Sequence, residues 1–185
     1  MSKIERFLPN NQYQAAINAN APSASNPFLT EADINALKHY GSFFDTTSQN
    51  GGSIRAFTLN TTDFANGISI VNNSEITFTA LGKYNLAFSA QLIKTGGAST
   101  NIWIWLRHNG VDVPDSATVL EMGNNNQYLV AAWNFFIDVN TNPQHFELMW
   151  YTPSADVSIG AITDVVTPVG VPAVPSIILT VNQVG

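Results

Sequence analysis

The chain has 185 residues, of which 45% are hydrophobic and only 11% charged, with seven Lys and Arg against thirteen Asp and Glu. Scattered basic residues on an acidic chain argue against nucleic-acid binding, and the lack of cysteine excludes disulfides, Cys-ligated metals and thiol nucleophiles. The sequence shows neither a membrane-spanning apolar run nor a signal-peptide pattern, so we expect a soluble protein made in a cytoplasm. So few charges indicate that much of its surface is either buried against partners or covered by neutral polar groups.

Residues 1–36 are predicted to form an extended N-terminal arm that ends in one short helix. Pro9, Pro22 and Pro27 favour extended backbone, and the few bulky apolar residues cannot offset the entropy of ordering this segment alone. Thr30 begins a capping-box pattern, which predicts the helix. An idle terminus is the alternative to a docking arm. We favour docking on a neighbouring protein, with these residues as anchors: Phe7, Leu8, Tyr13 and Phe28.

Residues 37–185 are predicted to form one all-β domain. Apolar and polar residues alternate with period two from Tyr40 onward, and turn residues interrupt the pattern at the short intervals typical of a sandwich or barrel. The proline-rich stretch 165–175 is excluded as a central strand because proline lacks the ladder donor, and it is predicted to lie extended over a surface. The predicted strands are 40–46, 54–59, 67–71, 75–80, 83–93, 101–108, 117–122, 127–138, 145–151, 155–161 and 176–181.

The stretch 101–116 is predicted to form a hairpin whose first strand is apolar on both faces. Trp103, Trp105 and Arg107 share one face of this strand. Asn109-Gly110 is the strongest short-range signal for a two-residue hairpin turn. The opposite face of the strand carries Ile102, Ile104, Leu106 and His108. A strand with two apolar faces needs two covers, one from the core of its own domain and one from another surface.

The charge of Arg107 on an aromatic face requires a partner. A carboxylate of a neighbouring subunit and water at the strand end are equally consistent with the sequence. Two further strands resemble that of Trp103 in having apolar residues on both faces, one with Trp133 and Phe135 and one with Trp150.

A set of marks lies between residues 67 and 92: Ser74 in a turn, Phe78-Thr79 at a strand end, and Gly82-Lys83-Tyr84 opening a long strand. These marks resemble the C1q/TNF-like jelly-roll family, and 103–113, 144–150 and 176–181 are similar to its later strands. The resemblance implies an antiparallel jelly-roll sandwich and a homotrimer that packs apolar sheet faces around a threefold axis. Whether each of the following belongs to the trimer seam or the core stays open: Trp103, Trp105, Arg107, Trp133, Phe135 and Trp150.

Other stretches are similar to virion proteins of tailed bacteriophages: 20–28 in the arm, and 40–47, 62–70, 104–116 and 131–135 in the body. This resemblance implies a structural component displayed on a virion. We expect a capsid decoration (cement) protein, a homotrimer on the capsid exterior whose arm docks on the major capsid protein and stabilises the shell. The alternative is a receptor- or glycan-binding head of a tail fibre or appendage. A secreted cytokine-like ligand is disfavoured because the signal-peptide pattern is missing.

The sequence shows no pattern of catalytic or metal-binding residues. His145 and Glu147 share a strand face and His108 ends another strand, but three histidines without a carboxylate cluster do not predict a metal site. Asp112 and Asp115 lie in one turn, where ordinary turn chemistry is favoured over a Ca²⁺ site. No nucleophile elbow or phosphate-binding glycine loop occurs. We therefore predict neither an enzyme nor a cofactor, and neither a nucleic acid nor a membrane as a partner.

Overall fold

The computed structural model describes residues 38–124, 126–162 and 171–185. The predicted arm and helix, with the docking residues Phe7, Leu8, Tyr13 and Phe28, lie outside the described residues, as does most of the proline-rich stretch. The predicted boundary between arm and body therefore stays a prediction. Within the described ranges every regular element is a strand, and no helix there is long and apolar enough to cross a membrane.

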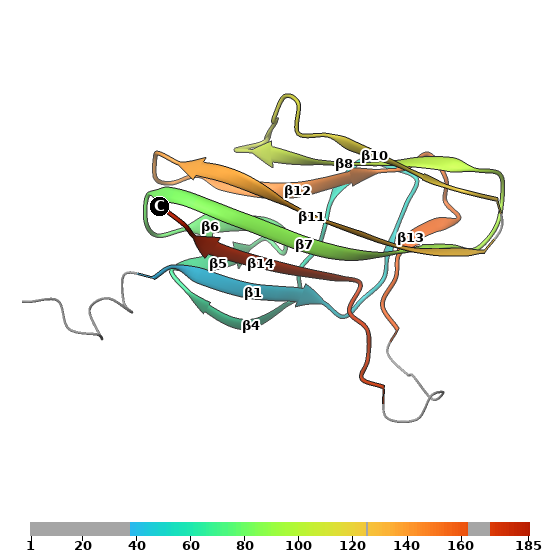
Figure 1. The fold of residues 1–185 in the computed structure, drawn as a ribbon, viewed down its shortest axis with the longest axis horizontal. Coiled ribbons are helices and arrows are strands. Elements are labelled where there is room, and N and C mark those ends of the chain that lie inside the picture. Colours follow the sequence, from blue (N-terminus) through green and yellow to red (C-terminus); the bar gives the residue numbers. More distant parts are fainter. Residues whose placement is uncertain (1–37, 125, 163–170) are drawn as a thin grey trace, which may run out of the picture. The chain divides into compact units, whose positions relative to one another are not determined.

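Two seven-stranded antiparallel sheets form the described unit (Figure 1). The first sheet contains β1 (Tyr40–Asp45), β2 (Gln49–Asn50), β4 (Thr61–Asn66), β7 (Gly82–Lys94), β11 (Gln127–Val139), β13 (Val157–Ile159) and β14 (Ile177–Gln183). Their order is β2-β13-β7-β14-β1-β4, and β11 pairs with β7 along its whole length. Because β7 also pairs with β14 and β13, it is the central strand of this sheet.

The second sheet contains β3 (Arg55–Ala56), β5 (Ile68–Val71), β6 (Glu75–Phe78), β8 (Thr100–His108), β9 (Val111–Asp112), β10 (Thr118–Met122) and β12 (His145–Tyr151). Their order is β10-β8-β12-β6-β5, with β3 paired to β12 and β9 paired to β8.

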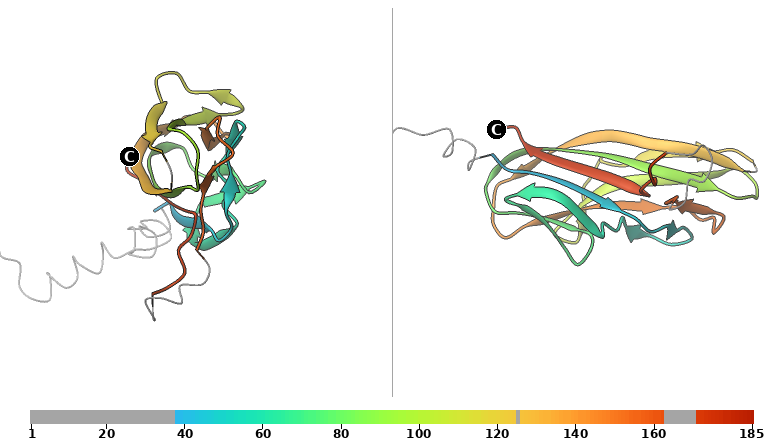
Figure 2. Two further views of the ribbon diagram at one scale, coloured as in Figure 1. Left: turned by 90° about the vertical axis from the view of Figure 1, so that its right-hand side faces the viewer. Right: turned by 90° about the horizontal axis from the view of Figure 1, so that it is seen from below.

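The chain crosses repeatedly between the two sheets. Four strands of the first sheet, in the order β1-β14-β7-β11, lie opposite four strands of the second, in the order β6-β12-β8-β10. In the end-on view the two layers face each other around the interior (Figure 2). Two opposed rows of four antiparallel strands, one within each seven-stranded sheet and linked by such crossings, are the jelly-roll arrangement. The predicted antiparallel jelly-roll sandwich is confirmed.

Most predicted strands are present, with two instructive differences. The predicted strand 54–59 contains only β3. The Phe57 amide still donates to Leu148 of β12 at 2.8 Å, but the Leu59 amide donates to Asn73, at 2.7 Å, in another part of the chain. Strand β4 was not predicted. It lies at the edge of its sheet and is largely exposed, so its residues show no apolar alternation.

Inward-facing residues of both sheets form the core. Trp150 is 0% exposed, and its ring lies 5.8 Å from that of Phe57 between centroids. Tyr84, the tyrosine of the Gly-Lys-Tyr mark, is also fully buried, and its hydroxyl donates to the Ala80 carbonyl at 2.9 Å. Burial raises the pKa of the Tyr84 phenol. The Gly82-Lys83-Tyr84 motif therefore contains a core residue whose hydrogen bond joins the start of β7 to the preceding turn.

The Asn109-Gly110 turn is found as predicted. Both residues have positive φ, 47° and 80°, as a type I′ hairpin turn requires. The turn sets the register between β8 and β9, which places Arg107 opposite Asp112. The Asn109 side chain also accepts a hydrogen bond from the His145 amide at 2.9 Å, which joins the turn to β12.

Candidate functional site

Three of the predicted seam-or-core residues face inward. Trp150 is part of the core. Trp133 and Phe135 lie on the inward face of β11 and pack against the core, with the Trp133 ring 4.7 Å from that of Phe88. For these three residues the structure favours the core over the seam.

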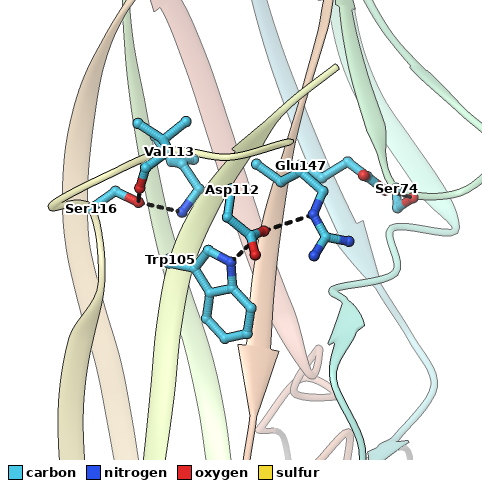
Figure 3. A network of polar contacts seen from close by, with 8 residues as sticks. Ser74, Trp105, Asp112, Val113, Ser116 and Glu147 are labelled. Carbon is cyan, nitrogen blue, oxygen red and sulfur yellow. Dashed lines mark hydrogen bonds and ion pairs between the residues drawn. The ribbon is translucent and has the colours of Figure 1, made fainter. Parts of the chain in front are cut away.

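The other three, Trp103, Trp105 and Arg107, are half-buried on the outer face of β8. Other residues of the same chain contact these side chains and bury part of their surface. Trp105 Nε1 and Arg107 Nε both donate to Asp112 Oδ1, each at 2.8 Å (Figure 3). Within the chain Arg107 pairs with a carboxylate of its own hairpin, a partner that the sequence reasoning did not consider. A role of this outer face in a trimer seam stays a prediction.

The segment after β9 is fastened to β8 by backbone and side-chain hydrogen bonds. The Val113 amide donates to the Leu106 carbonyl at 2.9 Å, and the Leu106 amide donates to Ser116 Oγ at 3.0 Å. Ser116 Oγ donates in turn to the Val113 carbonyl at 2.8 Å (Figure 3). These bonds hold the hairpin against the sheet, so that the Asp112 carboxylate has a defined position.

Hydrogen bonds from Arg107 and Trp105 hold the pKa of the Asp112 carboxyl below its ordinary value. A carboxyl with a depressed folded pKa stabilises the fold above its unfolded pKa of about 3.9, and this contribution is lost as the pH falls through the folded value.

Asp112→Asn should therefore melt at a lower temperature than the wild type at neutral pH, and the difference in melting temperature should close as the pH falls below about 4. Thermal melts across this range test it, with Asp115→Asn in the same turn as control. A gap that persists at the lowest pH contradicts the assignment.

The outer face of the first sheet carries no charged residue over its centre. Its neutral stretches are 40–44, 85–93, 128–136 and 178–182. We call the outward-facing residues of these stretches the neutral face. Lys83 and Asp138 lie at one end of it and pair with each other at 2.8 Å. Tyr128, Val130 and Phe136 are 72%, 54% and 73% exposed. Because charged residues are depleted at interface centres, this surface is the best candidate for one that a second copy covers.

Three asparagine side chains cross the neutral face from strand to strand. Asn134 Nδ2 donates to Asn85 Oδ1 at 2.7 Å, and Asn85 Nδ2 donates to Asn182 Oδ1 at 3.4 Å. When a partner covers polar groups and excludes water, amides that hydrogen-bond one another cost less free energy to bury than amides without such bonds. The neutral face is therefore suited to burial although it is not uniformly apolar.

No cluster of three or more His, Cys, Asp or Glu side chains that could hold a metal ion occurs among the described residues. Sequence reasoning favoured ordinary turn chemistry over a Ca²⁺ site for Asp112 and did not find its bonds to Trp105 and Arg107. The signal that could have found its role was the two-residue turn, since pairing across Asn109-Gly110 places residue 107 opposite residue 112. The asparagine row carried no comparable signal, because its three members come from strands far apart in the chain.

No family model matches the chain, and no curated protein matches it. Among the solved structures that are similar to it are the following two. Murine APRIL, a TNF-family protein, has 8% identity and a TM-score of 0.48, with 80% of this chain and 99% of that chain covered. The globular domain of zebrafish complement 1qA has 11% identity and a TM-score of 0.47, with 80% and 98% covered. The jelly-roll assignment of the described unit rests on its own strand order. At such low identity the likeness concerns the fold alone, and what the chain binds depends on its own surface residues.

Proposed function

We propose that this protein is a structural virion protein, a decoration (cement) protein that binds the exterior of a phage capsid as a homotrimer. The observation that carries the assembly is the neutral face, a charge-free surface on an acidic chain. C1q/TNF-like domains commonly form homotrimers. In a closed ring every copy contributes the same two surface patches. We assign both patches to the neutral face. The number of three copies is taken from the resemblance of the sequence to the C1q/TNF-like family.

The capsid as partner is supported by the similarity of 40–47, 62–70, 104–116 and 131–135 to virion proteins of tailed bacteriophages. The arm, residues 1–36, is the segment proposed to dock on the major capsid protein. Its spaced apolar residues can occupy separate pockets, and its prolines reduce the entropy lost when an extended segment binds.

Two measurements test this proposal. Light scattering of the full chain should give three times the 20.0 kDa mass of one chain, and a chain that begins at Thr30 should give three times its own, smaller mass. The shortened chain should no longer co-sediment with purified capsids of the virus that encodes the protein, whereas the full chain should. A monomeric full chain contradicts the homotrimer, and a shortened chain that still binds capsids contradicts docking by the arm. Antibody labelling on tails instead of capsids would favour the receptor-binding alternative.

A further inference from the structure

We propose that a hollow on the outer face of β8 and β12 is a binding site for a neutral saccharide. The hollow has a volume of about 340 Å³ and is lined by Trp103, Trp105, Asp112, Val113, Ala117 and Tyr151. It lies on the second sheet, whereas the neutral face lies on the first. The proposal therefore goes beyond the assembly role and does not depend on it.

Aromatic rings form the floor of the hollow. Trp103 and Tyr151 are directly opposite in the β8–β12 register, and their rings stack with centroids 5.7 Å apart and planes 22° apart. Trp105 continues the aromatic row along β8, and its indole N–H edge is fixed by the bond to Asp112 (Figure 3). The face of an aromatic ring is electron-rich. The C–H face of a sugar ring is weakly positive and apolar, so it packs well on such a surface.

One fixed hydrogen-bond acceptor stands beside the rings. Asp112 Oδ1 is taken by Trp105 and Arg107. Among the described residues no protein group donates to Oδ2, and the Asp112 side chain is 55% exposed. An ionised carboxylate oxygen accepts hydroxyl hydrogens strongly. Neighbouring sugar hydroxyls can therefore donate to Oδ2 while the ring stacks on the aromatic floor, which is how a site selects a polar molecule with an apolar face.

The charges around the hollow favour a neutral ligand over an ion. The Arg107 guanidinium lies 2.8 Å from the Asp112 carboxylate and balances its charge. A quaternary ammonium ligand would meet the rings but not a free negative charge. The Glu147 carboxylate, opposite Arg107 on β12, accepts a hydrogen bond from Ser74 Oγ at 2.7 Å and keeps its negative charge, which repels an acidic sugar. The volume lies near the lower end of the range of about 300–1,000 Å³ typical of small-molecule sites, which suits one or two sugar rings.

The test is a titration of the full chain with neutral trisaccharides of glucose, mannose, galactose and N-acetylglucosamine, followed by saturation-transfer NMR. At least one should bind with a Kd of about 10 mM or tighter. Trp103→Ala and Tyr151→Ala, each checked for an unchanged melting curve, should weaken that binding by at least about tenfold. Phe64→Ala removes an exposed aromatic ring from β4, at the edge of the other sheet and outside the neutral face, and should leave binding unchanged.

Asp112→Asn provides a second variant that keeps the aromatic floor, and it should weaken binding because an amide oxygen is a poorer acceptor. Choline chloride is the cationic probe and should not compete with the saccharide. The proposal is overturned if no trisaccharide binds, if choline displaces the bound sugar, or if Phe64→Ala weakens binding as much as Trp103→Ala does.

Discussion

Replacing Thr180 by arginine is expected to convert the assembled protein into monomers. Thr180 lies on β14 near the middle of the neutral face, where the register places it between Ala87 and Ser42. Three copies of the substitution would bury three unpaired charges in a surface that otherwise has none. An unpaired buried charge costs several kcal/mol, which is comparable to the whole gain from a modest interface.

The fold itself should survive this substitution, because the Thr180 side chain is exposed in the single chain. Light scattering measures the mass, and the far-ultraviolet circular dichroism spectrum should be unchanged. The matched control is Asn101→Arg, which adds the same charge at an exposed outer position of β8 on the other sheet. If Thr180→Arg keeps the mass of the wild type while Asn101→Arg lowers it, the seam lies on the second sheet and the neutral face is not the contact.

Replacing Trp150 by alanine is expected to lower the free energy of unfolding by about 3–5 kcal/mol, the range for deleting a large buried side chain. Trp150 is fully buried and packs against Phe57. Its Nε1 is also buried and has no acceptor among the described residues. Trp150→Phe should therefore cost clearly less than Trp150→Ala, because it keeps an aromatic ring in the core and removes a buried donor that has no partner.

Urea unfolding measures both variants, at one protein concentration because assembly adds to apparent stability. Ile54→Ala, at an exposed position before β3, is the control and should change the free energy of unfolding by no more than about 0.5 kcal/mol. Equal losses for Trp150→Phe and Trp150→Ala would mean that the indole N–H is satisfied in solution.

The local chemistry of the hairpin explains how far sequence reasoning could go. Asn109-Gly110 predicts a type I′ turn, and that turn alone implies that Arg107 faces Asp112, as the structure shows. The hydrogen bond from Trp105 to the same carboxylate follows from the side on which both residues point. The stack of Trp103 on Tyr151 is different. It joins two strands that are not neighbours in the chain, and no short-range pattern predicts their register.

By itself, the sequence determined that the body is built from antiparallel strands, where most of them lie, and which residues share a strand face. These properties depend on the two-residue period of the strand and on the backbone torsions that turn residues allow, both of which are local. Only the tertiary structure decided which face of each doubly apolar strand is buried. On β11, Trp133 and Phe135 face the core while Val130 and Phe136 face solvent, because pairing with β7 sets the side on which each row lies. That choice depends on contacts between distant strands, and it is what leaves one neutral face and one aromatic hollow on opposite sheets.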